Sequence, residues 1–166
     1  MCAAKTIHMK DSEFIWINGK LAAYESANIH ILTHSLHYGC AVFEGIRAYR
    51  TASGKTSLFR CAEHYKRFFN STEVFGYASP YSVEDLVSAT KEVIKANKFD
   101  ECYVRPIALL GESVRGLKLP DHPKVDIAIA TWKWGKYMGA EGQEKGVRLK
   151  TSSLKRPDVP QFMQGA

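Results

Sequence analysis

The stretch 33–47, THSLHYGCAVFEGIR, constrains the fold of this chain more than any other. Gly39 frees the backbone at its centre, because a residue without Cβ adopts positive φ at little cost. The run VFEGIR that follows alternates in character with period two, which is typical of a β-strand. Phe43, Gly45 and Arg47 would then share one face and supply an aromatic wall, a gap and a cation. These are parts of a small-molecule pocket that holds an anion; the alternative is a strand with a bulge and a surface arginine.

Strand patterns dominate the chain before residue 60. Asn18-Gly19 is the strongest short hairpin signal, and the cluster 51–55 is rich in turn-forming residues. The strands predicted in this region are Phe14–Ile17, Lys20–Tyr24, Asn28–Leu32, Val42–Arg50 and Thr56–Arg60. We expect the first two and the last two of these strands to pair as hairpins.

Two helices are predicted next, because the apolar residues change to helical spacing. The first covers Ala62–Phe75, and Gly76 is its predicted stop. The second follows Ser82, which is a favourable N-cap, and carries two acidic residues in its first turn, where they complement the helix dipole. Asn97 is expected to close the second helix.

The strand pattern then returns at Cys102–Leu110 and Val125–Ile129. Pro106 lies inside the first of these strands, which places that strand at a sheet edge or gives it a bulge. Hairpins combined with two consecutive helices predict an α+β fold, with a mainly antiparallel sheet and two main helices.

A change of composition marks the end of this unit. The run WKWGKYMGAEG is rich in aromatic residues and glycine, and we interpret it as a connection between domains. The expected organisation is a small α+β domain at residues 1–131, an interdomain loop at 132–142, and the truncated start of a second, larger domain at 143–166.

Bulk properties exclude several classes of protein. No apolar run approaches the ~18 residues of a membrane span, and the N-terminus lacks a secretory signal, so we expect a cytoplasmic protein without membrane contact. The cysteines form no CxxC pair, which argues against a disulfide framework or a zinc cage. The net charge is +6, but the basic residues are scattered and match no nucleic-acid motif, so no nucleic-acid partner is expected.

Three histidines form the one arrangement that suggests a metal. His30, His34 and His37 would lie on one face if they were helical, with i, i+4, i+7 spacing. Strand-like residues surround them and no carboxylate or cysteine completes a site, so no metal is expected. No GxSxG elbow is present in the sequence, so nothing supports Ser/His/Asp catalysis.

Several spaced motifs resemble one enzyme family. HSLHYG followed by VFEGIRAY is similar to the signature of branched-chain aminotransferases, in the fold-type IV group of pyridoxal-phosphate enzymes. The resemblance continues in order through IWINGKL, FRCAEHYKRF, YVRP, WGKYMG and TSS, and so covers the chain from about Phe14 to Ala166. Several motifs in order are far more specific than any one alone.

The resemblance implies a reaction. The parent enzyme would move the amino group of leucine, isoleucine or valine to 2-oxoglutarate, with glutamate as the product and pyridoxal phosphate as the cofactor. The alternatives are a D-amino-acid aminotransferase or an aminodeoxychorismate lyase of the same fold, or a non-catalytic binding or interaction module derived from it.

The resemblance also implies roles for individual residues. Arg67 matches the residue that grips the cofactor phosphate, a task that suits the guanidinium fork. The residues that match substrate-pocket positions are Phe43, Gly45, Arg47, Arg105, Trp134 and Tyr137. Arg105 matches the position proposed to let one pocket accept both an aliphatic side chain and the glutamate carboxylate. Tyr38 and Leu117 match positions that approach the neighbouring subunit's site, which implies a homodimer.

Structural alternatives stand beside these roles. Arg67 is otherwise a solvated helix arginine, Arg105 a strand-edge charge, and Tyr38 an amphipathic core tyrosine. Trp134 and Tyr137 are otherwise aromatic residues that pack a loop.

The sequence departs from the family at the catalytic lysine. Transamination needs a Schiff-base lysine, and in the family this lysine follows a run aligned with Phe162–Ala166, so it would fall just beyond the last residue. Lys150 and Lys155 do not match its position. We therefore expect no catalytic residue in this chain, no bound pyridoxal phosphate, and no activity from the 166 residues alone.

Overall fold

The computed structural model describes residues 12–111, 116, 118, 121, 123–135 and 139–155. Its strands are β1 (Phe14–Ile17), β2 (Lys20–Ala23), β3 (Val42–Phe43), β4 (Ile46–Arg50), β5 (Thr56–Leu58), β6 (Cys102–Leu110) and β7 (Val125–Trp132). Its helices are η1 (Tyr24–Ser26), α1 (His34–Tyr38), α2 (Cys61–Val74), α3 (Val83–Ala96) and α4 (Gly139–Lys145). Within the described residues, no helix has the length and apolarity needed to span a bilayer.

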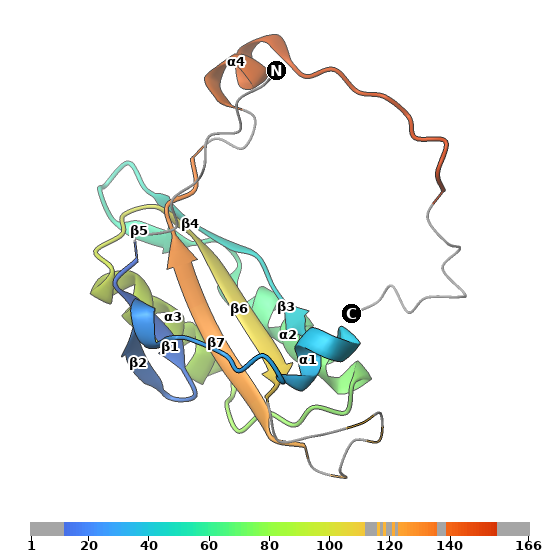
Figure 1. The fold of residues 1–166 in the computed structure, drawn as a ribbon. Coiled ribbons are helices and arrows are strands. Elements are labelled where there is room, and N and C mark those ends of the chain that lie inside the picture. Colours follow the sequence, from blue (N-terminus) through green and yellow to red (C-terminus); the bar gives the residue numbers. More distant parts are fainter. Residues whose placement is uncertain are drawn as a thin grey trace.

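The strands form one seven-stranded sheet in the order β2-β1-β7-β6-β4-β5, with β3 also paired to β6. Every strand pairing in it is antiparallel. Together with the two long helices α2 and α3, this confirms the predicted α+β class (Figure 1).

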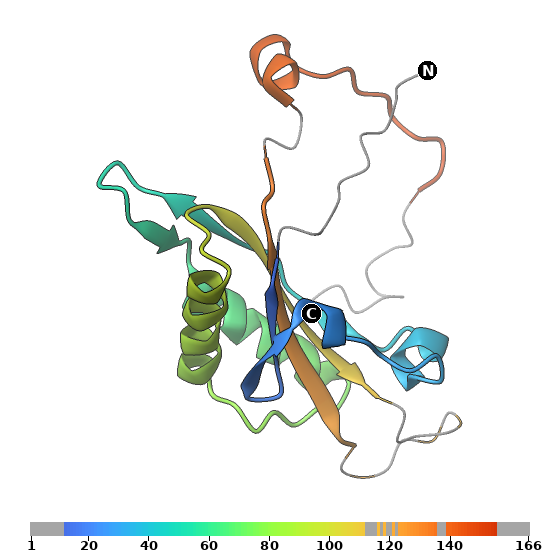
Figure 2. The same cartoon turned by 60° about the vertical axis from the view of Figure 1, so that its left-hand side comes forward.

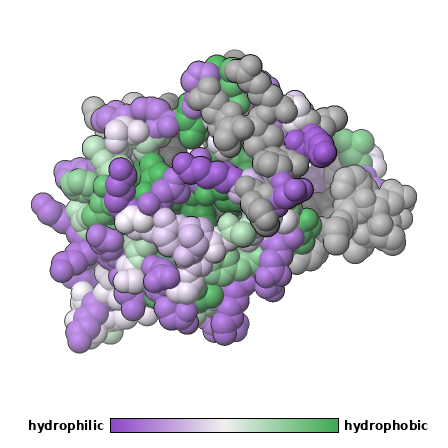
Figure 3. All heavy atoms as spheres, turned by 90° about the horizontal axis from the view of Figure 1, so that it is seen from below, coloured by the Kyte–Doolittle hydropathy of each residue, from purple (hydrophilic) through white to green (hydrophobic). Residues whose placement is uncertain are grey.

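The two long helices cover one face of the sheet, as Figure 2 shows, and we call this the helix-covered face. The opposite face is called the open face. Residues of β6 alternate strictly between buried and half-buried, so Val104 points into the core and its neighbours Tyr103 and Arg105 point to the open face. Tyr65, Phe68 and other apolar side chains of the helices fill the core beneath the sheet. Seen from below, hydrophobic and hydrophilic residues are interspersed on the surface (Figure 3).

The predicted hairpin at Asn18-Gly19 is confirmed. Asn18 and Gly19 both have positive φ, 48° and 93°, as expected for the turn type that asparagine–glycine favours. The Asn18 side chain accepts a hydrogen bond from Ile127 N at 2.9 Å and donates one to Asp126 at 2.8 Å. The turn is therefore fastened to β7 as well as closed on itself.

The two predicted helices are also confirmed. α3 begins with a capping box, in which Asp85 N donates to Ser82 Oγ at 3.1 Å and Ser82 N donates to the Asp85 carboxylate at 2.8 Å. Asn97 is the C-cap of α3, as predicted. The two helices meet through a buried hydrogen bond of 2.5 Å between the hydroxyl groups of Tyr65 and Thr90.

The predicted strand Asn28–Leu32 is wrong. Its backbone groups bond locally instead: Asn28 N donates to Ser26 O, and Thr33 N donates to His30 O. Leu32 N donates to the His30 ring at 3.1 Å, so the segment turns instead of extending along a neighbouring strand. The next residues form the single turn of α1, which Gly39 ends in the left-handed region with φ 66°.

The long predicted strand Val42–Arg50 is interrupted after Phe43, opposite Pro106. Both alternatives foreseen for Pro106 are wrong. β6 has neighbours on both sides, and the register is the same before and after the interruption, so no bulge residue is inserted. Pro106 O accepts a hydrogen bond from Glu44 N at 3.0 Å. In an antiparallel pair the return hydrogen bond would run from the N–H of residue 106 to the carbonyl of Glu44. Proline has no N–H, which explains why the ladder between β6 and the strands β3 and β4 pauses there.

The C-terminal part of the described chain departs from the layered body. Figures 1 and 2 both show α4 and the extended stretch 146–155 outside the layer of sheet and helices. The boundaries expected at residues 131 and 142 stay a prediction. Tyr137, Leu117 and the run Phe162–Ala166 lie outside the described residues.

Candidate active site on the open face of the sheet

Aromatic rings and one arginine gather on the open face. We call Phe43, Tyr103, Arg105, Trp132 and Trp134 the aromatic–arginine cluster. The Tyr103 ring centre lies 4.9 Å from that of Trp132 and 4.7 Å from that of Trp134, so strands β6 and β7 and the residues after β7 meet here. Arg105 lies over the Phe43 ring, with its guanidinium carbon 4.4 Å from the ring centre. Three of the predicted pocket residues are thereby brought together.

The electrostatics of this cluster favour an anion. Arg105 Nη2 donates to the Tyr103 hydroxyl at 3.1 Å. Its Nε is buried and has no hydrogen-bond partner among the described residues. The guanidinium therefore lies between apolar ring surfaces with a donor still to be satisfied, and a carboxylate is the group that fits such a donor best. Apolar walls and one cation can together accept either a hydrocarbon or a carboxylate.

Gly45 completes the cluster by leaving room for Tyr103. A Cβ at position 45 would lie 2.2 Å from the Tyr103 hydroxyl oxygen, a distance that no real contact allows. The gap predicted from the sequence thus exists, and Tyr103 fills it. Arg47 shares the open face and is paired across the ladder with Tyr103, but its guanidinium is engaged by Glu101 at 3.4 Å.

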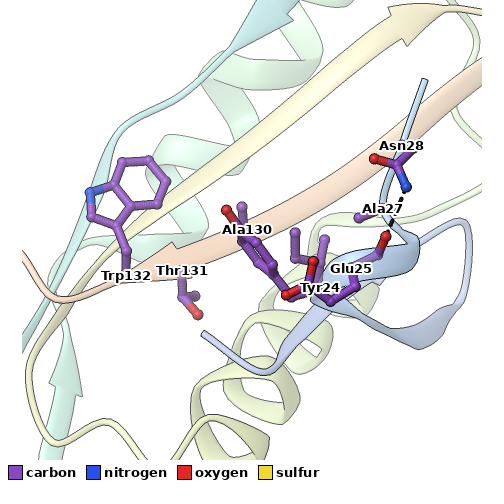
Figure 4. Close-up of a pocket in the computed structure, with 8 residues that line it drawn as sticks. Tyr24, Glu25, Ala27, Asn28, Ala130, Thr131 and Trp132 are labelled. Carbon is purple, nitrogen blue, oxygen red and sulfur yellow. Dashed lines mark hydrogen bonds between the residues drawn. The ribbon is translucent and has the colours of Figure 1, made fainter. Parts of the chain in front are cut away.

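A hollow of about 250 Å³ lies beside the cluster on the same face (Figure 4). Tyr24 and Asn28 come from η1 and the residues after it, while Ala130 and Trp132 come from β7. Trp132 lies at one end of the hollow and also belongs to the aromatic–arginine cluster, so this ring joins the hollow to the cluster.

Arg67 lies on the other side of the sheet, on α2. Its side chain is 61% exposed, yet it is not simply a solvated helix arginine. Nε and Nη2 donate to the two oxygens of Glu44, at 2.5 and 2.9 Å. His64 Nδ1 lies 2.9 Å from the same carboxylate. A hollow of about 330 Å³ in front of these groups is lined by Phe59, Arg60, Glu63, His64 and Arg67.

Glu44 is ionised in this setting. Burial opposes its ionisation, but hydrogen bonds from Arg67 and His64 outweigh burial and hold the pKa of Glu44 below its ordinary value. An ionised carboxylate only accepts hydrogen bonds, so the Nδ1 of His64 carries the proton. Two arginines line the hollow: Arg60 pairs with the exposed acid Glu63 and Arg67 with the buried Glu44, so the formal charges of these four groups balance. The guanidinium hydrogens that these pairs do not use can donate to an anion such as a phosphate group.

The histidines have partners within the chain. His34 lies 3.2 Å from Cys40 Sγ and 3.0 Å from Gly116 O, and His37 lies 2.9 Å from Ile31 O. Among the residues described, no three His, Cys, Asp or Glu side chains come together as a metal site. Tyr38 packs on His34 at 4.4 Å between ring centres and is 47% exposed.

Sequence reasoning missed several residues of these sites, among them Tyr103, Trp132, Glu44, His64 and Arg60. A signal existed for Tyr103, because it alternates with Arg105 along the same strand. Glu44 alternates with Phe43 and Gly45, so it had to face the helices, where a buried carboxylate needs a cationic partner. The sequence could not identify that partner, since Arg67 lies on a separate helix.

Comparisons with known proteins agree with this geometry. The family model of class IV amino-transferases matches residues 41–166. The branched-chain-amino-acid aminotransferase of Pseudomonas aeruginosa is 40% identical over 145 residues, which are 87% of this chain and 47% of the relative. The chain therefore spans about half the length of the curated relatives that it matches.

Solved structures give the same result. The branched-chain aminotransferase of Thermoproteus uzoniensis with norvaline has a TM-score of 0.81 and 34% identity, over 91% of this chain and 49% of that one. The T.th. branched-chain amino acid aminotransferase complexed with N-(5'-phosphopyridoxyl)-L-glutamate has a TM-score of 0.71 and 43% identity, over 76% and 42%. The chain belongs to the class IV aminotransferase family, and it corresponds to the N-terminal part of the branched-chain enzymes.

Proposed function

We propose that this chain supplies the substrate wall and one phosphate contact of a branched-chain aminotransferase. The proposed reaction moves the amino group of leucine, isoleucine or valine to 2-oxoglutarate and yields glutamate. The observation that carries the proposal is the aromatic–arginine cluster, where Arg105 lies 4.4 Å from the Phe43 ring centre with its Nε still unpartnered among the described residues.

The cluster suits both halves of such a reaction. The rings of Phe43, Tyr103 and Trp134 offer apolar surface for a branched aliphatic side chain. Arg105 offers a cation for the side-chain carboxylate of glutamate or 2-oxoglutarate. A related enzyme has been solved with a phosphopyridoxyl-glutamate adduct, which agrees with a dicarboxylate substrate of this kind. The selectivity between the two substrate types would then depend on whether the substrate side chain contacts the rings or the Arg105 guanidinium.

The cofactor proposed for the parent enzyme is pyridoxal phosphate, and the residues of the Arg67 hollow fit its phosphate. Arg67, Arg60 and His64 line the same hollow, and guanidinium groups bind phosphate through parallel charge-assisted hydrogen bonds. When bound, the cofactor supplies an electron sink for removal of the proton from the substrate Cα. The residues of this chain hold and orient the two ligands. Arg67 binds the cofactor phosphate, and the aromatic–arginine cluster contacts the substrate side chain.

We also propose a homodimer, in which Tyr38 and Leu117 approach the partner's site. Its support is a run of exposed apolar side chains, with exposed fractions from 47% to 73%, at Ile29, Ile31, Leu32, Leu36 and Tyr38. A surface of this kind on one segment is typical of a protein–protein interface. Ile31→Asp should convert a dimer to a monomer by light scattering, whereas Val74→Asp, on an exposed apolar residue of α2, should not. A dimer that survives Ile31→Asp contradicts this interface.

Substrate profiling tests the proposed function. The gene product read through to its stop codon, called here the complete gene product, is incubated with pyridoxal phosphate, 2-oxoglutarate and single amino donors, and glutamate is assayed. Leucine, isoleucine and valine should be the best donors. Preference for D-alanine would indicate a D-amino-acid aminotransferase. Pyruvate release from aminodeoxychorismate would indicate the lyase, and no turnover with any donor would indicate a non-catalytic module.

A further inference from the structure

A buried acid links the sheet to the Arg67 hollow. Glu44 follows β3, at the point where the ladder with β6 pauses, and its residue is 5% exposed. Its carboxylate accepts from Arg67 Nε and Nη2, from His64 Nδ1, and from the backbone N–H of Gly45 at 3.2 Å. Burying a carboxylate is costly even when it is paired, so an arrangement with this many donors calls for an explanation beyond packing.

The geometry of the guanidinium provides that explanation. An arginine has five N–H donors, which lie in one plane along two usable edges. Glu44 takes one edge, formed by Nε and Nη2. The other edge, formed by Nη1 and the second hydrogen of Nη2, remains for an oxyanion. Because the Arg67 side chain is 61% exposed and lines the hollow, this second edge is accessible to a ligand.

Holding one edge of the Arg67 guanidinium in place strengthens ligand binding at the other edge. A solvated arginine loses rotamer entropy when it binds a ligand. The two bonds to a buried carboxylate hold Arg67 in place before any ligand arrives, and this preorganisation strengthens binding without a new contact to the ligand. Glu44 is itself held by the strand and by Gly45 N, so it is a rigid anchor.

We propose that Glu44 is the positioning residue of the phosphate site: it holds Arg67 by one guanidinium edge so that the other edge receives the cofactor phosphate. Glu44 does not touch the cofactor and acts only through Arg67. This inference rests on the proposed function, because it takes pyridoxal phosphate as the ligand of the hollow.

Electrostatics alone predict the opposite effect, which makes the inference testable. A negative charge near a phosphate site weakens phosphate binding, so its removal should strengthen binding if Glu44 acts only through its charge. If Glu44 positions Arg67, its removal should weaken binding. Glu63 is the matched control, because it lines the same hollow and pairs with Arg60 at 3.2 Å without contacting Arg67.

The experiment measures the dissociation constant of pyridoxal phosphate by absorbance titration of the apo form of the complete gene product. Glu44→Gln should weaken binding about tenfold, the size of effect that loss of an orienting partner behind a metal ligand has on metal affinity. Glu63→Gln should bind as tightly as wild type or more tightly. In the Arg67→Ala background, Glu44→Gln should cause no further loss, whereas a merely structural role would give additive losses.

Three results separate the possible outcomes. Unchanged or tighter binding by Glu44→Gln, with weakened binding by Arg67→Ala, overturns the positioning role and leaves the phosphate assignment intact. Unchanged binding by Arg67→Ala overturns the phosphate assignment itself. Should Glu44→Gln fail to fold, Glu44→Asp decides: it keeps the charge but withdraws the carboxylate, so positioning predicts weaker binding and a charge effect alone predicts wild-type binding.

Discussion

The two faces of the sheet differ in whether their buried polar groups have hydrogen-bond partners within the chain. On the helix-covered face, the amide of Asn97 accepts from Glu13 N and Phe14 N and donates to three oxygen atoms of the chain. On the open face, the Nε atoms of Arg47 and Arg105 are buried with no hydrogen-bond partner among the residues described. The same strand, β6, contributes to both faces. The core of the helix-covered face is completed within the chain. The open face, like the Arg67 hollow at the edge of that core, keeps donors for something that the chain does not itself provide.

This difference separates stability from function. Buried polar groups that are fully paired specify one packing, whereas unpaired donors carry a cost that a folded chain retains only where a ligand or partner satisfies them. Substitutions in the core of the helix-covered face, away from the Arg67 hollow, should therefore change the free energy of unfolding. Substitutions on the open face should change substrate use more than stability.

Two phenylalanines give the largest expected contrast. Phe68 is 0% exposed in the core, and Phe43 is 59% exposed on the open face. Phe68→Ala should lower the free energy of unfolding of the chain by about 4 kcal/mol, because it leaves a cavity in a packed core. Phe43→Ala should lower it by less than about 1 kcal/mol. Urea unfolding measures both; similar losses would contradict the separation of the two faces.

Gly45→Ala should have the next largest effect, and on substrate use. The new Cβ displaces the Tyr103 hydroxyl, which lies 2.2 Å from the Cβ position, and so distorts the aromatic–arginine cluster. We expect kcat/KM for leucine in the complete gene product to fall about tenfold, or about 1.4 kcal/mol of transition-state stabilisation. Gly135→Ala is the control, because nothing lies within 4 Å of its Cβ position. Wild-type kinetics for Gly45→Ala would place Tyr103 outside the site.

Acid should produce the smallest effect, through Glu44. Its pKa is lowered in the folded chain, so its contribution to stability is present above the ordinary pKa of a glutamate and is lost as the pH falls through the lowered value. Wild type should be more stable than Glu44→Gln at pH 7, and the difference should shrink as the pH falls below the ordinary pKa of a glutamate. Glu92→Gln, on an exposed acid of α3, is the control for general charge effects. A difference that grows at acid pH contradicts the ionised Glu44.

Local signals predicted much of the fold. The turn at Asn18-Gly19 and the helix start at Ser82 were predicted correctly, because each depends on residues that are close in sequence. The alternation of Phe43, Gly45 and Arg47 also predicted their common face. The strand predicted at Asn28–Leu32 was wrong. Its β-branched residues are typical of a strand, but hydrogen bonds to His30 turn the backbone there.

The candidate site was predicted in part. Arg67 and Arg105 were identified by resemblance, but their immediate surroundings were not. Tyr103 fills the gap at Gly45 only because β4 and β6 pair in one particular register. Glu44 reaches Arg67 only because α2 packs on the helix-covered face. Contacts of this kind depend on tertiary packing, which no local pattern specifies.

One measurement tests the central claim that the open face selects the substrate. It compares kcat/KM for 2-oxoglutarate and for leucine in the complete gene product and in Arg105→Ala. Loss of a charge-assisted hydrogen bond of roughly 1.5–3 kcal/mol should lower kcat/KM for 2-oxoglutarate by about ten- to a hundredfold. The value for leucine should change by less than about threefold, because its side chain needs only the rings. Equal losses for both substrates would contradict the claim and make Arg105 a structural residue.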